Sequence, residues 1–142
     1  RYTYSRPTKD KTAEFFEVCK SLADYVFLDC TSSLVDPLSV YGMAAADKAV
    51  QLVTPDIRSA AYYASFEKTY EQIKGKSIGV INITDKDLYL PVGEVKAGFS
   101  NAKYILPYSM YLKQQYITGE LTHKIPDQKF SAVCRGIAGA VL

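Results

Sequence analysis

Residues 24–56 decide the fold of this chain, and they read DYVFLDCTSSLVDPLSVYGMAAADKAVQLVTPD. Residues 25–28 are a continuous apolar run of β-forming side chains, the pattern of a strand that is covered on both faces. Asp36 and Pro37 are typical of the N-cap and first position of a helix. Residues 49–53 then form a second apolar run that ends at a TPD turn. Strand, helix and strand with short joints predict a βαβ unit with parallel strands and a right-handed crossover.

The rest of the chain keeps alternating between helical and strand patterns. Apolar side chains recur at helical spacing in four further stretches, at about residues 11–22, 58–73, 91–99 and 127–141. Short apolar runs indicate strands at residues 77–82 and 103–106. The sequence therefore predicts a single α/β domain over residues 1–142. We expect a three-layer sandwich with a mostly parallel sheet of about four strands, at residues 25–29, 49–53, 77–82 and 103–106.

The segment Gly75-Lys76-Ser77 has the letters that end a phosphate-binding loop, but its context is different. Such a loop follows a strand and opens a helix. Here a predicted helix precedes Gly75 and a predicted strand follows it, so we expect Gly75 to be the C-cap of the helix.

Composition restricts the class of protein. The chain has 142 residues, of which 48% are hydrophobic and 23% charged, an ordinary globular balance. The net charge of +2 and the scattered Lys and Arg residues do not indicate a nucleic-acid partner. The spacing of the three cysteines, Cys19, Cys30 and Cys134, is not that of a zinc site. His123 is the only histidine, and no cysteine lies near it in the sequence to form a metal site with it. We find no apolar run that could span a bilayer and expect a cytoplasmic protein.

The order of the motifs resembles the MinD/ParA-like deviant-Walker ATPases, most closely their pilus-assembly and polar-localisation members. The resemblance rests on the apolar strand that ends at Asp29, on the AAD of residues 45–47 and on the VQLVTP of residues 50–55. It implies a partial P-loop NTPase (Rossmann-like) fold. It also implies that Asp29 is the Walker B-type carboxylate that holds Mg²⁺ through water. Thr31-Ser32-Ser33 stand where that family has Pro and Gly, so we expect a degenerate ATPase.

The same resemblance suggests how a nucleotide base would bind. In that family a strand ending in Val-Asn places the Asn beside adenine, and Asn82 ends such a strand here. The ILPYS of residues 105–109 resembles the family's IPYD segment, so Pro107 and Tyr108 are expected to form the pocket wall. From the residues alone, Asn82 is a common strand-ending turn residue and Tyr108 an aromatic that plugs the edge of the sheet.

The resemblance further implies that the chain is the C-terminal portion of a longer ATPase that positions or assembles cellular machinery. The intact protein would bind ATP and Mg²⁺ and would have a protein partner or form a homodimer. We expect no catalytic residue in this chain, and no contact with a membrane surface, because only Lys129 and Arg135 accompany the last apolar stripe. The alternative is a non-catalytic protein-interaction domain that keeps the ATPase-like fold. The third hypothesis is a receiver- or flavodoxin-like module. Such a module would need an acidic pair at the end of an earlier strand.

Overall fold

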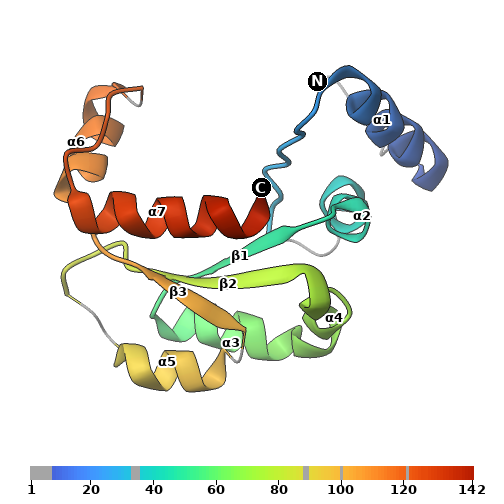
Figure 1. The fold of residues 1–142 in the computed structure, drawn as a ribbon. Helices are drawn as coiled ribbons and strands as arrows, with labels where there is room; N and C mark the ends of the chain where they lie inside the picture. The colour runs from blue at the N-terminus through green and yellow to red at the C-terminus, as the bar shows by residue number, and fades with distance from the viewer. Residues whose placement is uncertain (1–7, 33–35, 88–89, 100, 121) are drawn as a thin grey trace, which may run out of the picture. The chain divides into compact units, whose positions relative to one another are not determined.

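The computed structural model describes residues 8–32, 36–87, 90–99, 101–120 and 122–142. The chain divides into two compact units, Arg1–Asp47 and Lys48–Leu142. Within these residues, unit 1 contains two helices and unit 2 contains a parallel sheet with helices on both of its faces (Figure 1).

Unit 1 is built from α1 (Lys9–Leu22) and α2 (Pro37–Ala45), which pack against each other. Asp36 caps α2 as predicted, since its Oδ2 accepts a hydrogen bond from the N–H of Ser39 at 2.8 Å. Phe16 is buried, and a Cβ added to Gly42 would lie 3.4 Å from its ring. Phe15 and Leu22, two apolar side chains of the stretch at residues 11–22, are exposed rather than buried.

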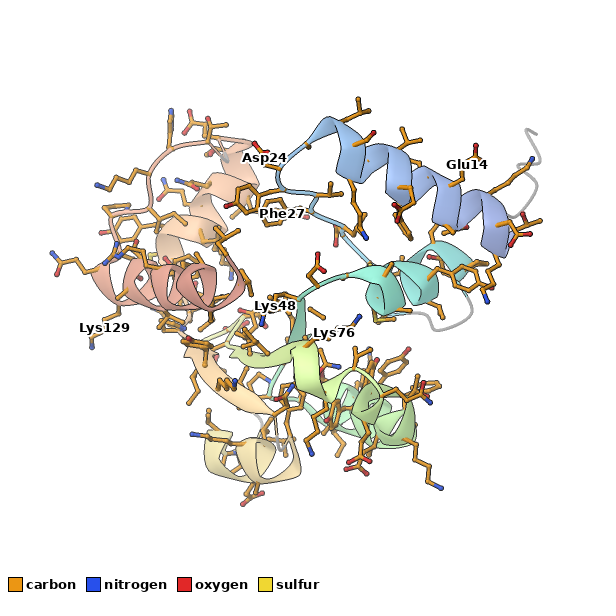
Figure 2. The ribbon with its side chains drawn as sticks, turned by 45° about the vertical axis from the view of Figure 1, so that its right-hand side comes forward. Glu14, Asp24, Phe27, Lys48, Lys76 and Lys129 are labelled. Atoms are coloured by element: carbon orange, nitrogen blue, oxygen red, sulfur yellow. The ribbon has the colours of Figure 1, made fainter. Side chains whose placement is uncertain are left out.

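The predicted strand at residues 25–29 is wrong. This segment follows α1 without pairing to any strand in the described part of the chain, and Figure 2 shows Phe27 on it and Asp24 just before it. The side chains of Tyr25 and Phe27 are 64% and 78% exposed. An apolar run indicates a preference for burial. It does not show whether a second strand is available to form the backbone hydrogen bonds that a strand requires. The βαβ unit predicted over residues 25–53 is therefore not observed.

Unit 2 contains the other three predicted strands. They are β1 (Ala49–Val53), β2 (Ser77–Asn82) and β3 (Ala102–Leu106), in the order β1-β2-β3. Both pairs are parallel, with Val53 opposite Ile81 and Asn82 opposite Leu106. The α/β class and the parallel sheet are thus as predicted, with three strands in the described residues rather than four.

Helices cover both faces of this sheet (Figure 1). On one face lie α3 (Ile57–Ser65), which contacts β1, and α5 (Val92–Gly98), which contacts β2. On the other face α7 (Gln128–Val141) packs against β3, and α6 (Met110–Thr118) precedes it in the chain. Asp127 caps α7, since its Oδ1 accepts a hydrogen bond from the N–H of Phe130 at 3.0 Å. No helix among the described residues is both long enough and apolar enough to cross a membrane.

The core of unit 2 lies between the sheet and the layer of α3 and α5. Val53, Ile81, Val95 and Phe99 form a buried cluster. The ring of Tyr63 packs edge-on against Phe99 at 4.6 Å between centroids. This packing holds the strands in register, and so it sets the positions of the residues that follow each strand.

The prediction of one continuous helix at residues 58–73 is wrong, although most of these residues are helical. The helix is divided into α3 and α4 (Glu67–Glu71), with Phe66 between them, and a 3₁₀ turn η1 (Lys74–Lys76) follows. Gly75 lies inside that turn and has no positive φ, so it is not the predicted C-cap. In the described residues the left-handed glycine is Gly119, after α6.

Candidate functional site

The carboxyl edge of the three-stranded sheet gathers the polar residues that end its strands. Thr54 follows β1, Asn82 ends β2, and Pro107 and Tyr108 follow β3. The register places Val53 opposite Ile81 and Asn82 opposite Leu106, so these strand ends are neighbours. In open α/β sheets ligands bind beyond the carboxyl ends of the strands, which makes this edge the first place to look for a site.

Asn82 is held at the end of the ladder between β2 and β3. The N–H of Ile83, the next residue, donates to the carbonyl of Leu106 at 2.9 Å, so pairing continues past the strand end. Asn82 is half-buried, and its side-chain amide can both donate and accept hydrogen bonds. Three of the residues singled out in the sequence, Asn82, Pro107 and Tyr108, therefore lie on adjacent strand ends.

A lysine that the sequence did not single out lies over the ring of Tyr108. The Nζ of Lys86 is 5.8 Å from the ring centroid, within the range of a cation–π contact. Lys86 belongs to the loop after β2, where its N–H is bonded to Asp85 Oδ1 at 2.6 Å. The edge thus presents one aromatic ring and one positive charge beside Asn82.

Ser109 adds a hydroxyl with unused hydrogen-bonding capacity. It follows Tyr108 directly and is the N-cap of α6, but its side chain makes no cap hydrogen bond. Ser109 is buried, and its Oγ has no hydrogen-bond partner in the described residues. A buried polar atom without a partner is costly, so a water or a polar ligand at this position would stabilise the edge.

The turn after β1 is fixed by its own hydrogen bonds. The hydroxyl of Thr54 donates to Asp56 Oδ2, and the N–H of Ser59 donates to Asp56 Oδ1 at 2.8 Å, so Asp56 caps α3. The hydrogen bond from Thr54, followed by that from Ser59, lowers the pKa of Asp56 below its ordinary value of 3.8. Asp56 is therefore charged at neutral pH, and both of its carboxylate oxygens already accept hydrogen bonds within the turn. We infer that it stabilises the turn and does not bind a ligand.

Asp29, the proposed magnesium carboxylate, belongs to unit 1 and not to this edge. It is exposed and does not end a strand. The loop after it is tied to α2, because the N–H of Thr31 donates to Ser39 Oγ at 3.0 Å. Burial, the largest cause, raises the pKa of the neighbouring Cys30 thiol. Asp29 thus belongs to unit 1, whereas Asn82, Pro107 and Tyr108 belong to unit 2.

Within the described ranges no three His, Cys, Asp or Glu side chains form a group that could hold a metal ion. His123 is exposed, with its Nδ1 3.7 Å from Glu120 Oε2. Mg²⁺ commonly takes one or two carboxylates together with water and substrate phosphates, so a single aspartate remains chemically compatible with it.

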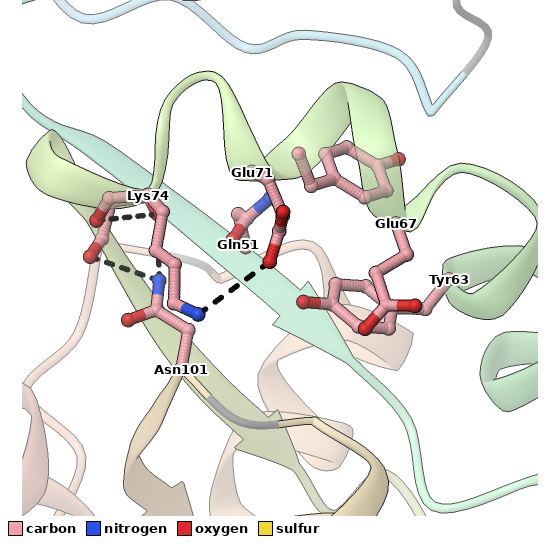
Figure 3. Close-up of a pocket in the computed structure, with 8 residues that line it drawn as sticks. Gln51, Tyr63, Glu67, Glu71, Lys74 and Asn101 are labelled. Atoms are coloured by element: carbon pink, nitrogen blue, oxygen red, sulfur yellow. Dashed lines mark hydrogen bonds and ion pairs between the residues drawn. The ribbon is translucent and has the colours of Figure 1, made fainter.

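A small hollow lies at the amino end of β2, away from Asn82 (Figure 3). The five steps from Ser77 to Asn82 span about 16 Å along the strand. Side chains of β1, α3, α4, η1 and the start of β2 line the hollow, which has room for about one water molecule and is too small for a nucleotide.

The contacts around the hollow identify it as structural. Asn101 Nδ2 donates to the carbonyl of Ser77 at 3.0 Å, and Lys74 Nζ lies 3.8 Å from Glu71 Oε1. Burial, the largest cause, raises the pKa of Tyr70 to about 12, so this phenol stays neutral. Gln51 Nε2 is buried and has no hydrogen-bond partner among the described residues, and a single water in the hollow would satisfy it.

Two of the polar residues at the carboxyl edge had a signal that sequence reasoning missed. Asp56 is followed three residues later by Ser59, a typical N-cap arrangement, and Ser109 stands directly before a helix. Lys86 had no such signal, because a cation–π contact between a loop and a distant turn depends on the fold and not on local spacing.

No protein family, curated protein or solved structure matched this chain in the comparisons made with each. Its geometry and chemistry therefore carry the functional argument.

Proposed function

We propose that this chain is a nucleotide-binding domain of the MinD/ParA-like type, degenerate as an ATPase, that serves to position or assemble cellular machinery in the cytoplasm. The observation that supports it best is the pairing of Asn82 with Leu106, which makes Asn82 a neighbour of Pro107 and Tyr108. An amide beside an aromatic ring suits a planar heterocycle that offers both donors and acceptors, as adenine does.

The residues at this edge fit a nucleotide base better than they fit phosphates. Asn82 supplies the hydrogen-bonding amide, Tyr108 an apolar ring face, and Ser109 a hydroxyl without a partner in the described residues. Phosphates are normally held by a glycine-rich loop between a strand and a helix. Gly75-Lys76-Ser77 is not such a loop, since it lies between helical segments and β2, and no other described connection from a strand to a helix contains glycine.

This difference leads to a direct test with adenosine and ATP. Isothermal titration calorimetry on the full chain, without added metal, should give dissociation constants for the two ligands within about threefold of each other, because the base supplies the affinity. Asn82→Ala and Tyr108→Ala should each weaken adenosine binding by about fivefold to tenfold, through loss of hydrogen bonds or of the ring face.

Tyr116→Ala is the matched control, since Tyr116 is an exposed tyrosine of α6 that takes no part in the proposed site. It should bind adenosine as the wild type does. The proposal is wrong if the wild-type chain binds neither ligand, or if Asn82→Ala binds adenosine as tightly as the wild type.

The role proposed for Asp29 can be tested separately. If Asp29 holds Mg²⁺ through water, adding the metal should strengthen binding of ATP but not of adenosine. Asp29→Ala should remove that gain, while Asp24→Ala, an exposed aspartate of the same segment, should keep it. A gain that survives in Asp29→Ala would exclude Asp29 as the magnesium carboxylate.

A second candidate function is a non-catalytic protein-interaction domain. It is favoured by exposed apolar side chains in unit 1, where Phe15, Leu22 and Phe27 are all exposed. Clusters of large exposed apolar side chains are typical of surfaces that bind other proteins. Failure of both adenosine and ATP to bind would leave this as the better explanation.

A further inference from the structure

The two edges of the sheet in unit 2 differ in how they are protected. Strand β3 carries the exposed Lys103, and its pairing with β2 contains an irregularity opposite Gly79 and Val80. A lysine and a bulge are the usual devices that stop an edge strand from pairing with another chain. The β3 edge is therefore protected against such pairing.

The β1 edge has none of these devices. In the part of the chain that the structure describes, β1 pairs with β2 alone. Its sequence, AVQLV, contains no charge and no proline, and its five residues pair with β2 without a shift in register. Val50 and Leu52 are 43% and 63% exposed. An unprotected apolar edge of this kind is a template for a further strand.

We propose that this edge pairs with the β1 edge of a second copy of the chain, in an antiparallel arrangement about a two-fold axis at Gln51. Such symmetry places Val50 opposite Leu52 of the second copy, and Leu52 opposite Val50 of the second copy. Both pairs lie on the exposed face of β1, where cross-strand apolar contacts stabilise pairing. An isologous contact needs a self-complementary surface, and this register provides one.

Charge also permits this arrangement. The same two-fold axis sets Lys48 opposite Thr54 of the second copy, so no like charges face each other along the paired strands. The two three-stranded sheets would join into one continuous sheet, with the bulged β3 strands at its outer edges. The inference does not depend on nucleotide binding.

Sedimentation equilibrium of the full chain tests the proposal. The wild type should form a species with twice the mass of the 15.8 kDa chain as its concentration rises. Leu52→Lys should weaken the dimer on the order of tenfold or more, because the symmetry disrupts both apolar pairs at once. Ile105→Lys is the matched control on the other edge, where Ile105 is 38% exposed, and it should dimerise as the wild type does.

Hydrogen exchange gives a second readout that needs no variant. Amides of β1 should exchange more slowly as the concentration of the wild-type chain rises, while amides of β3 should not change. A chain that stays monomeric at all concentrations overturns the proposal. So does a dimer that Leu52→Lys leaves intact, or one whose β1 amides show no dependence on concentration.

Discussion

Gly79 of β2 lies close to the backbone of Asn101. A Cβ added there would lie 2.5 Å from the carbonyl oxygen of Asn101 and 2.8 Å from the ring of Phe99. Asn101 cannot easily move away, because its carbonyl accepts from the N–H of Gly79 at 2.9 Å and its amide is bonded to the carbonyl of Ser77. Even alanine is therefore too large at this position.

Gly79→Ala should lower the free energy of unfolding by about 2–3 kcal/mol, because overpacking forces the backbone of β2 away from Asn101. Gly139→Ala is the matched control, since its Cβ would meet nothing within 4 Å. It should raise stability by about 0.5–1 kcal/mol through the better helix propensity of alanine. Urea unfolding of both variants measures the difference, and equal midpoints would contradict the close approach.

At the scale of elements, a tyrosine of β3 forms a hydrogen bond between the sheet and α7. Tyr104 donates its hydroxyl to the carbonyl of Gly136 at 2.9 Å. A Cβ added to Gly136 would lie 3.0 Å from the Tyr104 ring, so the absence of a side chain lets the helix approach this closely. At Gly136, therefore, Tyr104 both forms a hydrogen bond and packs its ring against the helix.

Tyr104→Phe should destabilise the protein by about 0.5–1.5 kcal/mol, because it removes the hydrogen bond and keeps the ring. Amides of α7 should exchange faster than in the wild type, whereas amides of α5 on the opposite face should be affected only through the global stability. Tyr111→Phe, which removes an exposed hydroxyl of α6, should change neither quantity. Unchanged α7 exchange in Tyr104→Phe would show that the helix is held by packing alone.

Which elements could be predicted from sequence depended on whether their signals were local. The α2 cap was predicted correctly because Asp36 acts within one turn of helix. The break between α3 and α4 at Phe66 could not be predicted, since residues 57–73 contain neither Gly nor Pro. The segment 25–28 has the composition of a strand, but pairing is a property of two segments and not of one.

The same distinction applies to the candidate site. Asn82, Pro107 and Tyr108 were singled out through a family resemblance, and the structure places them at the ends of the adjacent strands β2 and β3, because parallel strands end at one edge of a sheet. Lys86 was missed because its position over Tyr108 depends on the path of a loop. Asp29 was expected at the same edge only because residues 25–29 were taken for a strand, and that assignment failed.

At the scale of the whole molecule, the two units differ in how much apolar surface they bury. In unit 1 the one large apolar side chain that is buried among the described residues is Phe16. Unit 2 buries seven such side chains, and they are Val53, Ile78, Val80, Ile81, Val95, Phe99 and Phe130. Burial of apolar surface is the main stabilising contribution to folding, so the units should differ in local stability.

Native-state hydrogen exchange at increasing denaturant should resolve this difference. Amides of β2 should exchange only through global unfolding, while amides of α1 should exchange through a smaller opening with a weaker dependence on denaturant. Phe99→Ala should lower the opening free energy of β2 by about 3–5 kcal/mol. Phe16→Ala should speed exchange in α1 and leave β2 unchanged, because Phe16 belongs to unit 1 and β2 belongs to unit 2. If Phe16→Ala instead destabilised β2 as much as α1, the two units would unfold as one, and the division of the chain at Asp47 would have no energetic meaning.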